Sequence, residues 1–246
     1  MPGILVRFVS RMLAGLGRLI ARILLKVEII GQDNVPRNEP LIVVSNHFSW
    51  FDGPLLTLLL PVQPAFLIAT ESMRLWYWRL FMRFFTLIPI WRGRVDRKAL
   101  AAALKVLRSG GVIGVFPEGG IEPSLAEKRA RGELIQNVIF ARSVPELAEA
   151  RPGAAFLAVE SEVRILPVAL SGTENIWINL SRFRRTPVTI TIGEAFGPFK
   201  LEAEARGRTR REQLNHMSHM IMRRIARLFP PEKRGPYRGD SEVEAG

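Results

Sequence analysis

Cysteine is absent from the 246 residues of the chain. That absence excludes a disulfide scaffold, a thiolate-bound zinc site and a cysteine nucleophile, and it is neutral about the cellular compartment. The patterns Gly-x-Ser-x-Gly, Gly-x4-Gly-Lys and Gly-x-Gly-x-x-Gly are also missing. The chain therefore lacks the sequence signatures of a serine nucleophile elbow, a nucleotide phosphate loop and a dinucleotide-binding turn.

Acidic residues are scarce relative to basic ones. The chain has 23 aspartates and glutamates and 35 lysines and arginines, which gives a formal net charge of +12. An excess of this size calls for an anionic partner, and nucleic acid, an anionic membrane surface and a phosphorylated substrate are the three candidate classes. With 48% hydrophobic and 24% charged residues, the chain is long and apolar enough to bury a sizeable core, which excludes wholesale disorder.

The first 26 residues contain no acidic residue and no apolar run of the roughly 18 residues that a membrane-spanning helix needs. On a helical projection Arg7, Arg11, Arg18 and Arg22 fall within an arc of about 60°, with leucines and an isoleucine opposite. Such a basic amphipathic helix is typical of a segment lying in the membrane interface. A helix packed on the domain's own core, with its arginines in solvent, is the alternative interpretation.

Seven apolar stretches rich in β-branched residues predict strands. They are Val27–Ile30, Leu41–Ser45, Ala65–Ala69, Leu87–Trp91, Val112–Phe116, Ile165–Leu170 and Val188–Ile192. Helical patterns such as Arg97–Arg108 lie between several of them. This alternation predicts an α/β fold, a single layered domain over residues 27–229 with a mostly β central sheet flanked by helices and preceded by the amphipathic helix of residues 1–26.

Three other regions are less regular. Residues 230–246 contain two adjacent prolines and many charges, which predicts a flexible, loosely ordered C-terminal tail. Residues 122–150 are interpreted as a helical insertion of mixed charge. Residues 71–86 interleave six aromatic side chains with three arginines, a pattern that fits a membrane-facing helix, a nucleic-acid platform or a core helix.

The first stretch that indicates chemistry follows an apolar strand and contains His47 and Asp52. The two residues can meet only if the chain between them turns, because five positions on one regular helix are about 140° apart. If they meet, the carboxylate holds one imidazole nitrogen protonated and leaves the other free to act as a base. Ser45 and Ser49 nearby keep a hydrolase open as an alternative.

Three further blocks lie at predicted strands. Phe116-Pro117-Glu118-Gly119-Gly120 follows one strand, and its glycines permit a close backbone approach to an anion. Trp91-Arg92-Gly93-Arg94 brings arginines to the end of another strand, where they suit a phosphate. Pro167 stands inside the apolar stretch Ile165–Leu170 and predicts an edge strand or a bulge.

These four blocks, in this order, resemble the glycerolipid acyltransferase family typified by 1-acylglycerol-3-phosphate (lysophosphatidic acid) acyltransferases. The resemblance spans about residues 27 to 200, and residues 226–235 are also similar to bacterial members. It implies that His47 is the general base and that Asp52 orients it. It further implies that Arg92, Glu118 and Gly119 line the acceptor's phosphate and glycerol, and that Pro167 shapes the acyl-donor side.

The resemblance also suggests that Arg151, with Gly153, belongs to the substrate-binding residues. It implies an O-acyltransferase of phospholipid biosynthesis that needs no cofactor and takes acyl-CoA or acyl-carrier protein as donor and a lysophospholipid as acceptor. The expected setting is an anionic membrane surface, with the protein peripheral or monotopic on the cytoplasmic face of the cell membrane. No nucleic-acid partner is expected.

Departures from the family pattern leave the acceptor open. Many members have threonine and then a basic or serine residue after Phe-Pro-Glu-Gly, where this chain has Gly120 and Ile121. Glycerol 3-phosphate or another lysolipid is therefore an alternative acceptor, and a non-catalytic basic protein that binds membranes or nucleic acid is the alternative from another class. His216 and His219, three residues apart in a helical pattern, have no nearby acidic partner and are assigned to a plain helix surface without metal.

Overall fold

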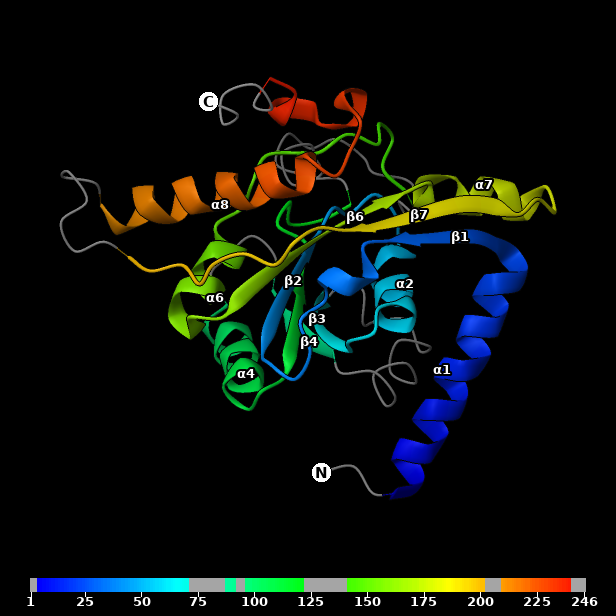
Figure 1. Ribbon diagram of the computed structural model, residues 1–246, viewed down its shortest axis with the longest axis horizontal. Coiled ribbons are helices and arrows are strands. Elements are labelled where there is room, and N and C mark those ends of the chain that lie inside the picture. Colours follow the sequence, from blue (N-terminus) through cyan, green and yellow to red (C-terminus); the bar gives the residue numbers. More distant parts are fainter. Residues whose placement is uncertain (1–3, 71–86, 92–95, 122–140, 202–208, 240–246) are drawn as a thin grey trace.

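The computed structural model describes residues 4–70, 87–91, 96–121, 141–201 and 209–239. Its centre is a seven-stranded mixed sheet with the strand order β1-β7-β6-β2-β5-β3-β4 (Figure 1). All neighbouring strands are parallel except β6 and β7. The strands are β1 (Leu25–Ile30), β2 (Leu41–Ser45), β3 (Pro64–Ala69), β4 (Leu87–Ile90), β5 (Val112–Val115), β6 (Arg164–Ser171) and β7 (Thr186–Ile192).

The predicted α/β fold and all seven predicted strands are confirmed, with ends that differ by a residue or two. One boundary was wrong at the N-terminus. The helix α1 covers Ile4–Leu24, and Leu25 already begins β1 by pairing with Thr186. Leu25 is buried between the sheet and its helices, and this packing outweighs the helical pattern of the residues before it.

Helices cover both faces of the sheet and divide the core into two hydrophobic clusters. On one face lie α4 (Arg97–Arg108), α6 (Gly153–Ser161) and α8 (Arg210–Ala226), whereas α1, α2 (Asp52–Leu59) and α7 (Ile176–Ser181) lie on the other (Figure 1). Alternate residues of the central strands feed the two clusters, as in β2, where Ile42 and Val44 face one side and Leu41 and Val43 the other.

Side chains at the helix starts explain where two of these helices begin. The Asp96 carboxylate accepts hydrogen bonds from the backbone N–H groups of Lys98 and Ala99 and so caps α4. Thr209 and Glu212 form a reciprocal capping box at the start of α8.

The helix α1 packs on the domain through small residues rather than through its large apolar ones. Ala21 is buried, and Gly17 lies against the Leu58 side chain of α2. Its large apolar side chains are 37–61% exposed: Met12, Leu13, Leu16, Leu19, Ile20, Ile23 and Leu24. The alternative of a helix packed on the domain's own core is therefore correct for Gly17 and Ala21 and wrong for these large apolar side chains. No helix among the described residues is both long and apolar enough to cross a membrane.

Pro167 lies in a central strand, because β6 has β7 on one side and β2 on the other. The edge-strand interpretation was wrong, but a bulge is present. Ile165 pairs with Phe196 and Val168 pairs with Ile192, so three steps along β6 match four steps along its partner. The Gly193 N–H donates to the Pro167 carbonyl at 2.9 Å, and the missing N–H of the proline falls where the ladder is already interrupted.

The segment after α8 is packed onto the domain at residues 230–239, so the prediction of a loosely ordered tail was wrong there. Two short 3-10 helices, Pro231–Lys233 and Gly235–Tyr237, fold back over the sheet end (Figure 1). Tyr237 is buried, and the Lys233 ammonium contacts Glu174 and Ser171 at 2.9 and 3.1 Å. These contacts outweigh the turn-forming composition that predicted disorder.

Candidate functional site

The candidate site lies at one end of the sheet, where two neighbouring parallel strands end. β2 ends at Ser45, two residues before His47, and β5 ends at Val115, three residues before Glu118. Because β2 and β5 pair in parallel, their carboxyl ends lie side by side. Residues that follow such strand ends are in the usual place for a site in an α/β fold.

The chain between His47 and Asp52 turns, and the two side chains meet. The Asp52 Oδ2 lies 3.0 Å from the His47 Nδ1 and accepts a second bond of 2.7 Å from the Ser49 N–H. The Asp52 side chain is completely buried at the first residue of α2. An ionised carboxylate can only accept here, so the His47 Nδ1 carries a proton, and in the neutral imidazole the Nε2 keeps its lone pair.

Asn46 extends the sheet by one rung just before the histidine. Its side-chain amide donates to the Leu170 carbonyl at 2.9 Å and accepts from the Leu170 N–H at 2.8 Å. The regular β2–β6 ladder ends at Ser45, so a side chain replaces the next backbone pair. Sequence reasoning missed Asn46, although a completely buried amide next to the histidine has to find such partners.

The imidazole of His47 is the end of a stack of rings. It lies against Phe116, with ring centroids 4.0 Å apart and an interplanar angle of 11°, and Phe116 stacks on Phe66 at 5.3 Å. Gly114 of β5 makes room for this stack, because a Cβ at that position would overlap the Phe66 ring. The stack fixes the plane of the imidazole, while the bond to Asp52 fixes its rotation within that plane.

Gly114→Ala is expected to destabilise the fold by about 1–3 kcal/mol, because the new methyl group pushes the Phe66 ring into Phe116. Urea unfolding measures the loss of stability, and a lower rate of the reaction proposed below measures the shift of His47. Gly15→Ala is the control, since nothing lies within 4 Å of the added methyl group in α1. Equal stability of the two variants would contradict the proposed role of Gly114.

Glu118 is bonded inward rather than toward an open cleft. Its carboxylate is completely buried and accepts from the His47 N–H at 3.0 Å and from the Ala148 N–H at 2.8 Å. It also forms an ion pair with Arg142. Burial raises the pKa of Glu118 above its ordinary 4.5, and Arg142 and the two backbone N–H groups oppose that rise. In this structure the carboxylate positions the backbone of the histidine.

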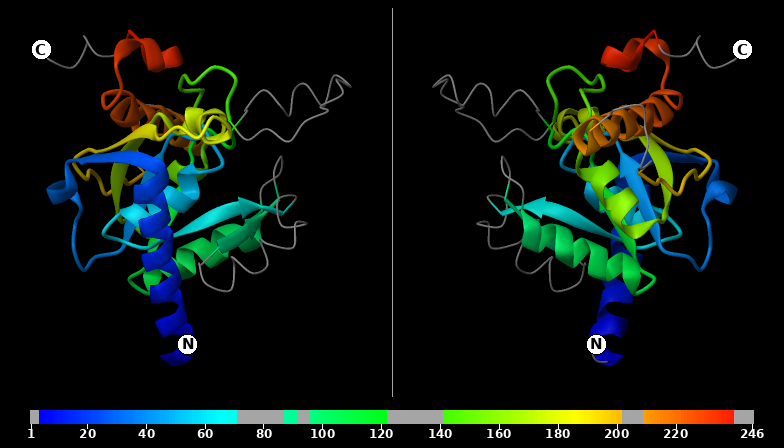
Figure 2. Two further views of the ribbon diagram at one scale, coloured as in Figure 1. Left: turned by 90° about the vertical axis from the view of Figure 1, so that its right-hand side faces the viewer. Right: turned by 90° about the vertical axis from the view of Figure 1, so that its left-hand side faces the viewer.

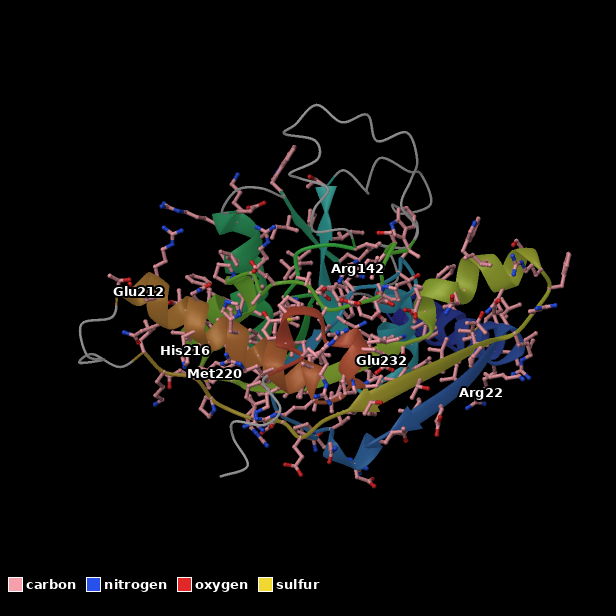
Figure 3. All side chains as sticks on the ribbon, turned by 90° about the horizontal axis from the view of Figure 1, so that it is seen from above. Arg22, Arg142, Glu212, His216, Met220 and Glu232 are labelled. Atoms are coloured by element: carbon pink, nitrogen blue, oxygen red, sulfur yellow. The ribbon has the colours of Figure 1, made fainter. Side chains whose placement is uncertain are left out.

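Arg142 is the buried partner that sequence reasoning missed. Besides Glu118, its guanidinium donates to the backbone carbonyls of Ile121, Gly120 and Glu146. Its own backbone N–H donates to the Phe48 carbonyl at 2.7 Å. Figure 3 shows Arg142 toward the middle of the molecule. Arg142 therefore joins the His47 loop, the Glu118 loop and the chain that follows.

The interpretation of residues 122–150 as a helical insertion was wrong for residues 141–150, which form an irregular segment, and residues 122–140 lie outside the described residues. Mixed charge at near-helical spacing suggested the helix. A lone arginine in such a stretch gives no local signal, because its partner Glu118 is 24 residues away in the sequence.

The C-terminal segment, residues 230–239, is hydrogen-bonded to the stretch that contains Ala148. The Tyr237 hydroxyl accepts from the Ala150 N–H at 3.1 Å and is hydrogen-bonded to the His219 Nδ1 at 3.0 Å. The Leu147 N–H donates to the Lys233 carbonyl at 2.9 Å. These bonds hold both ends of the stretch whose Ala148 N–H binds Glu118. His219 is thus half-buried and bonded, which corrects its assignment to a plain helix surface, whereas His216 is exposed.

Tyr237→Phe is expected to destabilise the fold by about 1–2 kcal/mol near neutral pH, because it leaves the Ala150 N–H without its acceptor. Burial raises the pKa of Tyr237 to about 12 from its ordinary 10. The unfolded chain therefore ionises first, and the wild type loses this part of its stability as the pH rises from about 10 to 12. Urea unfolding at pH 8 and at several pH values from 10 to 12 should show that the difference in the free energy of unfolding between wild type and variant shrinks as the pH rises. A difference that stays constant would contradict the role assigned to the Tyr237 hydroxyl.

The structure places three of the other four predicted substrate-binding residues besides Glu118, and the fourth lies outside the described residues. Gly119 adopts a φ of +81°, and the stem of Arg151 packs 3.2 Å from where a Cβ would stand. The Arg151 N–H donates to the Pro117 carbonyl at 2.7 Å, so the exposed Arg151 side chain lies beside the Glu118 loop. Pro167 is buried opposite Val44, three residues before His47. Arg92 lies outside the described residues.

Chemically, the described residues offer a partly buried imidazole whose Nδ1 is bonded to a buried carboxylate. The N–H groups of His47, Ser49 and Gly119 are already bonded within the protein and are not free to stabilise an oxyanion. Among the described residues, no three histidine, aspartate or glutamate side chains gather where they could hold a metal ion.

Comparisons with known proteins agree with the geometry. A family model described as Acyltransferase matches residues 26–171. A curated 1-acyl-sn-glycerol-3-phosphate acyltransferase of Borreliella burgdorferi is 29% identical over 163 residues, which are 63% of this chain. The chain spans about half of that relative's length, 54%. The crystal structure of the 1-acyl-sn-glycerophosphate (LPA) acyltransferase PlsC from Thermotoga maritima matches with a TM-score of 0.61 at 22% identity, over 91% of this chain and 80% of that one, and shows the shared fold.

Proposed function

The chain belongs to the acyltransferase family, and on that premise we propose that it transfers a fatty acyl group from an acyl thioester to the free hydroxyl of 1-acylglycerol 3-phosphate. The observation that carries the proposal is the 3.0 Å contact between the His47 Nδ1 and the buried Asp52 carboxylate, within the matched region. The donor is acyl-CoA or acyl-carrier protein, and no cofactor is required.

In the proposed step His47 is the general base. A hydroxyl is barely ionised near neutral pH, so the Nε2 of His47 takes its proton as the oxygen attacks the thioester carbonyl. Asp52 stabilises the imidazolium that forms and holds the ring in place. The acyl–oxygen bond forms as the acyl–sulfur bond breaks, and the thiol leaves with a proton. No covalent acyl-enzyme is needed.

Glu118 and Arg142 act as positioning residues in this scheme. Glu118 binds the His47 N–H, and Arg142 neutralises Glu118. Gly119 and Arg151 lie beside them, and the exposed Arg151 guanidinium is the described group that we assign to the acceptor's phosphate. Arg92 keeps the same predicted role, and Pro167 that of shaping the acyl-donor side. An acceptor of related chemistry, such as glycerol 3-phosphate or another lysolipid, would use the same base.

The protein is proposed to work at an anionic membrane surface, as a peripheral or monotopic protein on the cytoplasmic face. The exposed apolar side chains of α1 from Met12 to Ile23 support this, since they lie on a helix whose described charges are all positive. Both substrates are amphiphiles that a bilayer concentrates. A nucleic-acid partner is not part of the proposal.

The test is acyl transfer from acyl-CoA or acyl-carrier protein to lysophosphatidic acid dispersed in detergent, with glycerol 3-phosphate and lysophosphatidylcholine as competing acceptors. The proposal expects phosphatidic acid as the main product. Preference for another acceptor would correct the substrate and keep the reaction. Absence of transfer to every acceptor, together with tight and salt-sensitive nucleic-acid binding, would favour a non-catalytic basic protein.

A further inference from the structure

We propose that the turn between α7 and β7, residues 182–185, is a second membrane anchor that inserts the Phe183 ring into an anionic bilayer beside α1. The inference rests on the membrane setting of the proposed function and deepens it. It assigns a second point of contact, and with two points the molecule has a defined orientation on the lipid surface.

The Phe183 side chain points into solvent and does not pack on the domain. Its side chain is 101% exposed, and its φ of 53° lies in the left-handed region that bulky residues seldom adopt. Trp177 and Ile178 of α7 are 53% and 51% exposed. Three large apolar side chains within seven residues form an exposed cluster of the kind that marks an interaction surface.

The charges around this cluster identify the partner as anionic. Arg182, Arg184 and Arg185 flank Phe183 and are exposed, and residues 175–193 contain no acidic residue. An aromatic ring between arginines suits the headgroup level of a bilayer, where the ring enters the apolar boundary and the guanidinium groups meet lipid phosphates. A second copy of this chain would bring the same positive charges, so an anionic lipid surface fits better.

The turn is fixed to the end of α1 by the sheet. β1 and β7 pair in parallel from Leu25 and Thr186 onward, so their N-terminal ends meet at one corner. α1 ends directly before β1, and the turn ends directly before β7. The Arg185 guanidinium donates to the backbone carbonyls of Arg22 and Leu25, both at 2.6 Å. The two apolar features therefore cannot move independently at this corner.

The views of the molecule agree with this placement. α1 and α7 lie on the same side in Figure 1, and both face the viewer when that side is turned forward in the left-hand view of Figure 2. Figure 3 shows Arg22 toward the end that carries α7, away from Arg142. α1 and the turn that follows α7 therefore lie on the same side of the molecule.

The direction of β7 connects the anchor with the candidate site. β7 runs antiparallel to β6, and β6 runs parallel to β2. The N-terminal end of β7 therefore lies at the same end of the sheet as the carboxyl end of β2, where His47 follows. Anchoring the turn holds that end of the sheet at the lipid, where an amphiphilic acceptor presents its hydroxyl.

The absence of cysteine permits a clean test. Phe183→Cys carries an environment-sensitive fluorophore, and Ile30→Cys, at the opposite end of β1 and 47% exposed, carries the same fluorophore as the control. With vesicles of phosphatidylglycerol and phosphatidylethanolamine, emission at position 183 is expected to increase and shift to shorter wavelength, and emission at position 30 is expected to stay unchanged. Phosphatidylcholine vesicles should produce little change at either position.

A second variant measures the contribution to affinity. Phe183→Ser is expected to weaken partition into the same anionic vesicles about tenfold, because the inserted ring is lost. Its acyl transfer on detergent-dispersed substrate should equal that of the wild type, and Ile30→Ser should bind vesicles as the wild type does.

The outcomes separate the proposals. If the wild type binds anionic vesicles and Phe183→Ser binds equally well, the second anchor is overturned and contact through α1 stands. If the label at position 183 responds to protein concentration without vesicles, the surface is a contact between copies of the chain and the anchor is likewise overturned. Insertion at position 183 without acyl transfer to any acceptor would support the anchor and overturn the proposed reaction.

Discussion

His47→Ala is expected to lower the rate of acyl transfer about 10³-fold, within the roughly 10²–10⁴-fold that a positioned general base contributes. The imidazole is held from two directions, by the Asp52 carboxylate at 3.0 Å and by the Phe116 ring at 4.0 Å between centroids. An alanine keeps neither the base nor a group that could substitute for it. The initial rate of thiol release from acyl-CoA in the presence of lysophosphatidic acid measures the effect.

His216→Ala is the matched control, because this exposed histidine of α8 has no place in the proposed step. It should transfer acyl groups at the wild-type rate. Asp52→Asn should fall between the two, since the amide keeps the shape of the carboxylate but does not stabilise the imidazolium. A wild-type rate in His47→Ala would remove the histidine from the mechanism, whatever the family of the chain.

Arg142→Met is expected to destabilise the fold by roughly 3–5 kcal/mol, the cost of leaving a buried carboxylate without its counter-ion. The Glu118 side chain is completely buried, and that of Arg142 is 4% exposed. Methionine retains much of the length and none of the hydrogen bonds to Ile121, Gly120 and Glu146. Urea unfolding gives the change in the free energy of unfolding.

The destabilisation of Arg142→Met should grow with pH. Burial raises the pKa of Glu118, and the positive charge of Arg142 beside it opposes that rise, so the variant raises this pKa further. A carboxyl whose folded pKa exceeds its unfolded value favours folding at low pH and loses that contribution as the pH rises through the folded pKa. The loss of stability should therefore be smaller at pH 5 than at pH 8.

Arg164→Met is the control for a surface pair. Arg164 and Glu39 are 44% and 38% exposed at 3.4 Å, and their loss should change stability by less than about 1 kcal/mol. The double variant Glu118→Gln with Arg142→Met should recover part of the loss, because no charge remains buried. A loss as small as that of Arg164→Met, or one that is the same at both pH values, would contradict the role assigned to the buried pair.

Local patterns in the sequence were sufficient for the sheet and, together with the family resemblance, for the pair formed by His47 and Asp52. The apolar β-branched stretches all become strands of one sheet, completely buried in β2 and partly exposed in β1 and β4. The block from His47 to Asp52 forms its contact within a single turn. Arg142 and the packed segment around Tyr237 were missed for the opposite reason. Their partners, Glu118 and Ala150, are 24 and 87 residues away, so only the folded chain brings them together.

Pro167 illustrates an intermediate case. The residue type correctly predicted an irregular ladder, because proline has no N–H to donate. It did not predict that the irregularity falls within the sheet, since the extra residue belongs to the partner segment before Phe196. The position of a strand within a sheet depends on pairing that a local pattern does not encode.

The amide of Asn46 has a consequence for when the chain becomes ordered. Asn46 is bound to Leu170 on one side, and Asp52 is held at the start of α2 on the other. The short loop between them therefore loses its conformational entropy during folding and not when a substrate binds. In the proposed reaction the acceptor alcohol then meets an imidazole that is already held in place, and none of its binding energy is needed to arrange the ring. Turnover and resistance to heat should therefore decline together in variants that loosen this loop.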